Sequence, residues 1–428
     1  MPFTHVLALL VFAGAYILIA TERIHRVAAA LGGAALMLAL GLTDGDAAFY
    51  SHDSGIDWNV IFLLFGMMII VGVLRRTGLF EALAVTAAKR ARGRPFAVLV
   101  MLLLITAVAS ALLDNVTTVL LVSPVTFIVC ERLGLPVAPY LIAEVMASNI
   151  GGSATLIGDP PNIIIASRAS LDFNDFLTNL LPFAVLMTLV LIGLCRWLFR
   201  DTFRYDPERA AEVMALSARA AIRNKVLLIQ SLAVLVLVIV GFALQPVLHK
   251  EPAVVALIGA GVLVMISSVT VEDAIADVEW ETLVFFMGLF VMVGALVETG
   301  LIKQFADLLA DATGGNLTVA ALTLLLASLA LSGVVDNIPY VATMAPVVAV
   351  LAGQHGDGSG VLWWALALGA DLGGNATAVG ASANVVVLGL ARKYGQPISF
   401  WQFTRYGLVV TAASAVCAVP WLFLRYGI

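Results

Sequence analysis

Charge and cysteine are both scarce in this chain. Only 12% of the 428 residues are charged, about half the share in a soluble globular protein, whereas 61% are hydrophobic and the mean hydropathy is +1.04. The three cysteines, Cys130, Cys195 and Cys417, lie far apart in apolar stretches, which indicates small core side chains rather than a disulfide framework or a metal cluster. A net charge of −5 argues against a nucleic-acid partner.

Long runs of apolar residues make up much of the sequence. Residues 6–20, 226–244 and 408–424 are about long enough as helices to cross a hydrocarbon layer of ~30 Å. The first run lacks a basic start and a small-residue cleavage site, so we predict a retained span and not a signal peptide. The sequence therefore predicts an all-α, multi-pass protein of the cell (cytoplasmic) membrane, in contact with lipid.

One polar motif occurs twice. Asp114-Asn115 returns as Asp336-Asn337, an offset of 222 residues. The same offset pairs a series of other residues without a gap: Trp58 with Trp280, Gly66 with Gly288, Gly78 with Gly300, Pro124 with Pro346, Gly151-Gly152 with Gly373-Gly374, Thr155 with Thr377, and Asn162 with Asn384. Such an internal repeat in an apolar chain is typical of secondary transporters built from two related halves.

The repeat predicts the domain organisation. The first half, 1–200, holds five spans (4–20, 27–42, 58–74, 138–168 and 176–198) and the hairpin 95–130. The second half, 226–428, holds 226–244, 254–266, 283–296, 362–390 and 403–424 and the hairpin 317–351. Five crossings per half require the halves to be inverted relative to each other. We expect about ten transmembrane helices, two broken helices and two re-entrant hairpins, the arms of 95–130 being only ~15–18 residues each and so shorter than a full crossing.

Basic residues predict the orientation. With the N-terminus outside, nineteen of the 23 Lys and Arg residues fall in cytoplasmic segments, which satisfies the positive-inside rule. The segment 201–225 then becomes a cytoplasmic linker between the halves, and we expect it to be a solvated connector that touches lipid headgroups.

Four polar segments interrupt the apolar pattern: 114–118, 148–162, 336–339 and 371–384. Paired glycines, and two prolines in 148–162, prevent continuous helix there, and the freed backbone groups are costly in hydrocarbon unless they meet an ion, a ligand or water. An isolated Gly-Gly or Asn would indicate only close helix packing, but here both recur in one register. We predict that the four segments converge on one cavity, with these substrate- or ion-binding residues: Asp114, Asn115, Thr117, Thr118, Asn149, Gly151, Gly152, Ser153, Thr155, Asp159, Asn162, Asp336, Asn337, Asp371, Gly373, Gly374, Asn375, Thr377 and Asn384.

Four of these residues are carboxylates. Asp114, Asp159, Asp336 and Asp371 are candidates for proton coupling or cation binding, because an acidic residue inside a membrane can load and release a proton. We expect protons or Na⁺ as coupling ions, with Na⁺ at Asn115 and Asn337, and no organic cofactor.

The stretches 64–77, 111–124 and 142–165 resemble the ion transporter superfamily, above all through the phrases LLDNVTTVLL and SNIGGSATLIGDPPN. The similar branch contains arsenite permeases (ArsB), the P protein and NhaD-type antiporters. The resemblance covers essentially the whole chain and implies a homodimeric transporter of the elevator type. Sodium-coupled dicarboxylate transporters, a more remote likeness, have Ser-Asn-Thr at each hairpin tip, where this chain has Asp-Asn-Val and Asp-Asn-Ile.

The four segments contain no Arg, Lys or His to meet an anion. They therefore favour a small neutral inorganic solute, and we expect proton-coupled efflux of arsenite or antimonite. Na⁺/H⁺ antiport is the close alternative, and an organic-anion (dicarboxylate) carrier comes third. The chain has no G-x-x-x-x-G-K-[ST] loop for ATP, which leaves a separate ATPase subunit open as a partner.

Two other classes fit less well. An intramembrane aspartyl protease needs two aspartates a few ångströms apart, whereas here each Asp recurs beside Asn at a hairpin tip. A passive channel would conduct without proton coupling. We therefore predict a membrane transporter and not an enzyme.

Overall fold

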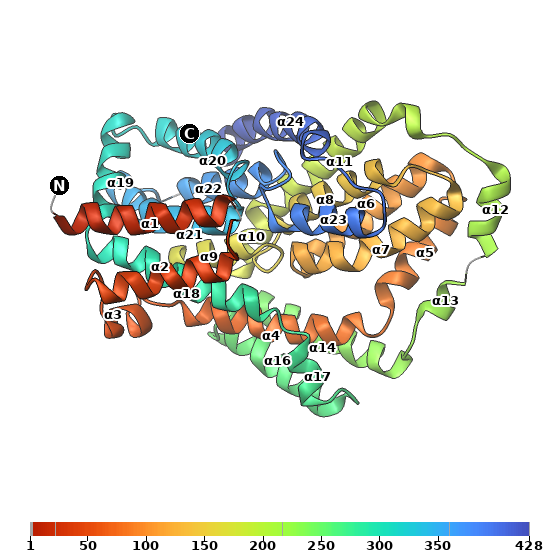
Figure 1. Ribbon diagram of the computed structural model, residues 1–428, viewed down its shortest axis with the longest axis horizontal. Coiled ribbons are helices and arrows are strands. Elements are labelled where there is room, and N and C mark those ends of the chain that lie inside the picture. The colour runs from red at the N-terminus through yellow and green to blue at the C-terminus, as the bar shows by residue number, and fades with distance from the viewer. Residues whose placement is uncertain (1–2, 22, 216, 359, 428) are drawn as a thin grey trace.

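The computed structural model describes residues 3–21, 23–215, 217–358 and 360–427, and the described chain is all-helical (Figure 1). Within these residues, nine helices are at least 18 residues long and apolar enough to cross a membrane, or ten if the bent pair α19 and α20 is counted as one span. The prediction of an all-α membrane protein is thus confirmed.

The first half contains eleven α-helices and ends in a connecting segment. The helices are α1 (Phe3–Thr21), α2 (Arg26–Ala39), α3 (Gly45–Tyr50), α4 (Trp58–Arg75), α5 (Leu79–Arg90), α6 (Pro95–Leu112), α7 (Asn115–Leu133), α8 (Val137–Gly152), α9 (Pro160–Ala169), α10 (Phe173–Asn179) and α11 (Leu181–Leu198). The connecting segment holds a 3₁₀ turn, Arg200–Thr202, and the short helices α12 (Pro207–Ala215) and α13 (Ala218–Ala221).

The second half follows the same order. Its helices are α14 (Lys225–Ala243), α15 (Gln245–Leu248), α16 (Pro252–Ile266), α17 (Val271–Ala276), α18 (Trp280–Glu298), α19 (Leu301–Ala312), α20 (Leu317–Ser332), α21 (Asn337–His355), α22 (Val361–Gly373), α23 (Ser382–Lys393) and α24 (Phe400–Tyr426).

Helix boundaries recur at the offset of 222 residues. Helices α5 and α19 begin and end at corresponding positions, and so do α7 and α21. The breaks recur as well, because α8 stops at Gly152 before α9 starts at Pro160, and α22 stops at Gly373 before α23 starts at Ser382. Each break falls in one of the Gly-containing polar segments, as expected from the high cost of glycine and proline inside a helix.

The second arm of the hairpin 95–130 is longer than predicted, whereas its first arm has the predicted length. Helix α6 has 18 residues and α7 and α21 have 19 each, so three arms match a full crossing in length. The difference arises because each second arm starts at the Asn of the Asp-Asn pair and continues past the apolar run, into Glu131-Arg132 in α7 and Gln354-His355 in α21. Conversely, the crossings α2 and α16 have only 14 and 15 residues.

One further expectation is corrected and another is refined. The predicted span 176–198 is divided at Leu180, because Pro182 is tolerated in the first turn of α11 but not inside a continuous helix. The separate helix α10 begins at a capping box between Asp172 and Asp175. The linker 201–225 is mostly exposed, as expected for a solvated connector, but it is also held against the protein. Ala210 and Val213 of α12 are buried, and the Arg223 N–H donates to the carbonyl of Thr77 at 2.9 Å.

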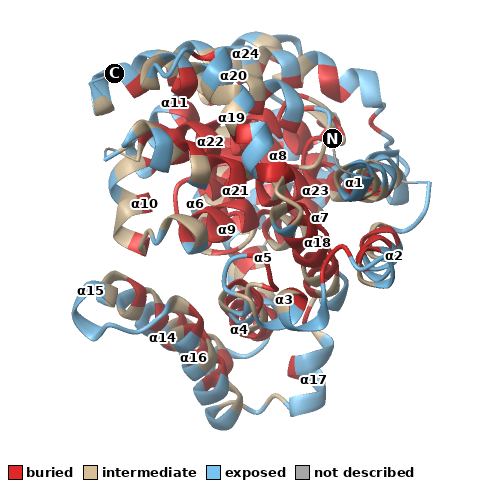
Figure 2. Cartoon of the chain, turned by 90° about the vertical axis from the view of Figure 1, so that its left-hand side faces the viewer, coloured by how far each residue is buried: buried red, intermediate tan, exposed pale blue. Residues whose placement is uncertain are grey.

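The two halves pack across each other. Helix α4 of the first half packs on α16 and α14 of the second, and α18 of the second half packs on α2 and α1 of the first. Helices α4, α14 and α16 lie together along one edge of the molecule in both views (Figures 1 and 2). The two most buried helices, α8 and α22, lie near the centre (Figure 2), and they are the ones that lead into the breaks.

Candidate functional site

At each hairpin tip, the Asp and the Asn of the Asp-Asn pair have different roles. The carboxylate of Asp114 accepts the N–H of Thr117 at 2.8 Å and so caps the start of α7. Asp336 accepts the N–H of Ile338 at 3.0 Å and caps α21. Such caps satisfy amides that a helix start leaves unpaired. Because Asp is used as the cap, the next residue, Asn115 or Asn337, is the first helical residue and is fully buried.

The two buried asparagines meet at one carboxylate. The Nδ2 atoms of Asn115 and Asn337 donate to the same oxygen of Asp159, Oδ2, at 3.0 and 3.1 Å. Asp159 is the last residue before α9, and its other oxygen is buried without a hydrogen-bond partner. The tips of both hairpins and the break of the α8–α9 span therefore meet at one point, as the sequence predicted.

The break between α22 and α23 joins the same cluster through Asn149. The Asn149 amide donates to Oδ1 of Asn375 at 3.0 Å and to Oδ1 of Asn384 at 3.1 Å. Asn115 also reaches Oδ1 of Asn149, at 3.4 Å. Asn115, Asn149, Asp159, Asn337, Asn375 and Asn384 thus form one buried polar cluster that all four predicted segments reach.

Matching side chains hold the two breaks. Asn162 donates to the carbonyls of Gly152 and Thr155, at 3.4 and 3.1 Å. Its repeat partner Asn384 donates to Gly374 and Thr377, both at 2.8 Å. The hydroxyls of Thr155 and Thr377 each donate at 2.6 Å to a carbonyl of the preceding hairpin arm, Ala111 and Gly333. These hydrogen bonds of Asn162, Asn384, Thr155 and Thr377 stabilise the unwound backbone of the two breaks.

Gly151 and Gly373 serve close packing. A Cβ at Gly151 would lie 2.2 Å from the carbonyl oxygen of Ala107, and a Cβ at Gly373 would lie 2.7 Å from that of Leu329. Both neighbours belong to the first arm of a hairpin, at corresponding positions of the repeat. These two glycines let each broken span approach its hairpin.

The remaining predicted residues lie around the cluster. Asp371 is completely buried, and neither of its oxygens accepts a well-formed hydrogen bond, although the Asn162 amide lies close to it. Ser153 caps the end of α8 by donating to the carbonyl of Ile150 at 2.8 Å. The buried hydroxyl of Thr118 has no partner.

Thr117 faces away from the cluster, toward the start of α18. Its hydroxyl lies 3.4 Å from Oε1 of Glu279, whose other oxygen accepts from Thr282 at 3.2 Å. Burial raises the pKa of Glu279 from 4.5 to about 7, and the nearby charge of Asp114 adds to this rise. Hairpin one therefore touches α18 through a carboxyl group that titrates near neutral pH.

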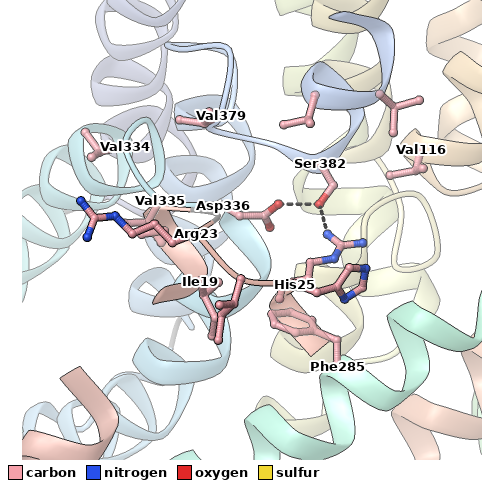
Figure 3. A pocket seen from close by; sticks show the side chains of 15 residues that line it. Ile19, Arg23, His25, Val116, Phe285, Val334, Val335, Asp336, Val379 and Ser382 are labelled. Atoms are coloured by element: carbon pink, nitrogen blue, oxygen red, sulfur yellow. Dashed lines mark hydrogen bonds between the residues drawn. The ribbon is translucent and has the colours of Figure 1, made fainter. Parts of the chain in front are cut away.

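A cavity of about 470 Å³ opens beside Asp336 (Figure 3). Its walls are the α1–α2 loop, Phe285 of α18, the tip of hairpin two and the start of α23. In its wall, Ser382 donates to Asp336 and accepts from the Arg26 guanidinium, whose Nη1 lies 2.8 Å away. Arg23 and His25 also line the cavity.

Arg23, His25 and Arg26 correct the expectation that no basic side chain is available at the site to meet an anion. The four polar segments carry no Arg, Lys or His, but Arg26 reaches Ser382 from the start of α2, 356 positions away in sequence. The signal available in the sequence was the basic character of the α1–α2 loop, which was used only for orientation. Glu279 and the buried Glu144 were also missed. Within the described residues, no three His, Cys, Asp or Glu side chains gather to hold a metal.

Comparisons with known proteins agree with this architecture. A citrate transporter family profile matches residues 16–369. An uncharacterized transporter of Mycobacterium bovis is 54% identical over 423 residues, covering 98% of both chains. The human P protein is 35% identical over 98% of this chain, which spans 60% of the P protein.

Among solved structures, the crystal structure of the Alcanivorax borkumensis YdaH transporter matches with a TM-score of 0.60. The match covers 100% of this chain and 99% of the other at 17% identity, and so it supports the fold alone. The family profile and the full-length relatives carry the assignment further. The chain belongs to the citrate transporter family, and it is a multi-pass membrane protein and a secondary transporter.

Proposed function

We propose that the chain is a proton-coupled secondary transporter of a small organic anion, and that the cargo binds in the cavity between Arg26 and Asp336. The observation that carries the proposal is the contact of Arg26 with Ser382 at the mouth of the α22–α23 break. A cavity of about 470 Å³ is within the usual range for small-molecule sites.

Charge in the cavity favours an anion over a neutral solute. The guanidinium of Arg26 offers paired donors that match a carboxylate, and Arg23 adds a second positive charge. The N-terminus of α23, at Ser382, adds a partial positive charge. The name of the matched family, citrate transporter, points to the same class of cargo.

Coupling to protons follows from the carboxylates. Asp159 and Asp371 are completely buried, and no ion pair to either is found in the described part of the chain. Neighbouring buried carboxylates cannot all be ionised without a large electrostatic cost, so proton uptake is the simplest way to neutralise them. Na⁺ at Asn115 and Asn337 is less favoured, because both amides present N–H groups, not oxygens, to Asp159.

Efflux of arsenite or antimonite is the second candidate. Ser382, at the cavity wall, and the amides of the buried cluster could bind the hydroxyl groups of undissociated arsenous acid without any charge. This candidate predicts that loss of Arg26 leaves transport intact. Na⁺/H⁺ antiport ranks third.

The repeat also supports a mechanism. Helix boundaries that recur with an odd number of crossings per half fit two inverted repeats, 1–200 and 226–428, joined by 201–225. We propose alternating access of the elevator type, with the hairpins and broken helices moving together against α4, α14, α16, α18, α1 and α2. The homodimer and the N-terminus-outside orientation are proposed with it, the latter on the distribution of basic residues.

The test is uptake into proteoliposomes under an imposed pH gradient, with radiolabelled citrate, succinate, arsenite and Na⁺ in parallel. The proposal predicts that an organic anion accumulates above equilibrium and that a protonophore abolishes the accumulation. Accumulation of arsenite alone, unaffected by Arg26→Gln, would move the second candidate to first place. Flux that only equilibrates would indicate a passive channel.

A further inference from the structure

Glu144 is a buried acidic residue outside the candidate site. It lies in the middle of α8 and is 1% exposed. It lines neither the cavity at Asp336 nor the second cavity, of about 780 Å³, which lies between the α3–α4 loop and α9. An acidic residue inside a membrane protein is expensive to bury, so its presence calls for a function.

One hydroxyl is the partner of Glu144. Thr126 of α7 contacts Oε1, and the same hydroxyl lies 3.4 Å from the carbonyl of Val122. The second carboxyl oxygen, Oε2, is buried without a partner. No ion pair with Glu144 is found within the described residues.

The helices around α8 bring no charge to Glu144. Among the described residues, the buried thiol of Cys130 on α7 lies near enough to interact with the charge of Glu144. Helix α6 carries no ionisable residue. Helix α22 carries one, Asp371, which lies at the central cluster. The charged residues of α7, α11, α23 and α24, none of which pairs with Glu144, are Glu131, Arg132, Arg196, Arg392, Lys393, Arg405 and Arg425.

Hydrogen bonding favours a neutral carboxyl in this environment. A protonated Glu144 donates to Thr126, which is then free to donate its own proton to the carbonyl of Val122, so that both hydroxyl protons find an acceptor. An ionised Glu144 would be a buried charge facing one neutral donor, an arrangement of high cost. A metal ion would need several more oxygens than this site offers.

The second half of the repeat supplies an internal control. At the offset of 222 residues, Glu144 corresponds to Leu366 and Thr126 to Val348, and both are completely buried between the equivalent helices α22 and α21. The fold therefore accepts an apolar pair at this position. Packing alone does not require Glu and Thr in the first half.

The location of Glu144 connects it to the central cluster. One helical turn further along α8, the Ser148 hydroxyl lies 3.1 Å from both the carbonyl of Asn115 and the hydroxyl of Ser110. Asn115 in turn donates to Asp159. Glu144 thus lies between the α7–α8 loop and the cluster, on the interface between a hairpin arm and a broken span.

We propose that Glu144 is a second proton-binding site, at which proton binding keeps α7 packed on α8 and proton release loosens this interface during the transport cycle. The link to the cycle rests on the proposed proton coupling, but occupancy of the site by a proton does not.

The test compares the full-length protein with Glu144→Gln and with the double variant Glu144→Leu/Thr126→Val, which copies the Leu366–Val348 pair. Infrared difference spectra between acid and alkaline pH are recorded for each in lipid vesicles. We expect the wild type to show a protonated-carboxyl band that disappears at high pH and is absent from both variants. Identical spectra for the wild type and Glu144→Gln would overturn the proposal.

Transport provides the second readout. The double variant should fold, as shown by an unchanged melting transition. Its transport rate, plotted against pH, should no longer change on one side of the optimum. If the infrared band is lost but the pH profile is unchanged, the proton site stands and its role in the cycle is refuted. If no transport is found for any cargo, the infrared result still decides whether Glu144 binds a proton.

Discussion

Asn115 and Asn337, which occupy the same position in the two halves of the repeat, donate to the same carboxyl oxygen of Asp159, at 3.0 and 3.1 Å. The position that corresponds to Asp159 in the second half is Ala381. Two symmetric hairpin tips are therefore tied to a single, unsymmetric carboxylate. A change in the charge of Asp159 would therefore act on both hairpin tips at once.

Replacement of Asp159 should separate stability from coupling. In Asp159→Asn, the carbonyl oxygen still accepts from both asparagines, so we expect the stability to change by no more than about 1 kcal/mol. In Asp159→Ala, two buried amide donors lose their acceptor, at about 1–3 kcal/mol each. Apparent melting temperatures in detergent should therefore fall clearly for the Ala variant alone. Equal melting temperatures for both variants would show that the two bonds carry no stability.

The two break-holding asparagines should differ in importance. Asn162 and Asn384 each bond two backbone carbonyls, but Asn384 also accepts from Asn149 at 3.1 Å. We expect Asn384→Ala to be more destabilising than Asn162→Ala by about 1 kcal/mol, the usual contribution of one hydrogen bond. Thermal unfolding of the two variants side by side checks this, and a reversed order would contradict it.

Arg26 should govern affinity for an anionic cargo. Arg26→Gln keeps a donor for Ser382 but removes the charge, so KM for the organic anion should rise about tenfold or more, as expected for loss of a charge-assisted bond. Arg23→Gln is the comparison variant: Arg23 lines the same cavity but is not seen to bond Ser382 or Asp336, so loss of its charge should raise KM less than loss of Arg26 does. An equal, small effect of both variants on KM would argue against direct binding by Arg26.

Glu279 should make the contact between hairpin one and α18 depend on pH. Burial raises its pKa from 4.5 to about 7, so the folded protein holds this proton more tightly than the unfolded chain. Its contribution to stability is therefore largest below pH 4.5 and is lost as the pH rises to about 7. Glu279→Gln should flatten the melting temperature over this range. A profile unchanged from the wild type would refute this role.

Much of the candidate site could be predicted from the sequence, because identical residues recur at a fixed offset in the two halves. Asp-Asn pairs, glycine pairs and Asn162 with Asn384 all mark places where the backbone leaves the helical pattern, and periodicity makes such places visible. The convergence of the hairpin tips on a break followed from the same reasoning, since unpaired backbone groups inside a membrane need polar partners.

Other features depend on contacts that no local pattern reveals. Arg26, the first residue of α2, reaches Ser382 across 356 positions, and the sequence around Arg26 resembles an ordinary basic connection between two spans. The division of work within Asp114-Asn115, where Asp caps the helix and Asn enters the cluster, depends on where α7 begins. Glu144 stands alone in an apolar stretch of sequence. A role for it is indicated only by its contact with Thr126 and by the comparison with the apolar pair Leu366 and Val348 in the second half.

The most direct test of the account is proton-driven accumulation of the organic anion by proteoliposomes containing the wild type or Asp159→Asn. The account predicts that the wild type concentrates the anion under an inward proton gradient, whereas Asp159→Asn, though folded, does not. Accumulation by Asp159→Asn at the wild-type level and with the wild-type dependence on the gradient would contradict it.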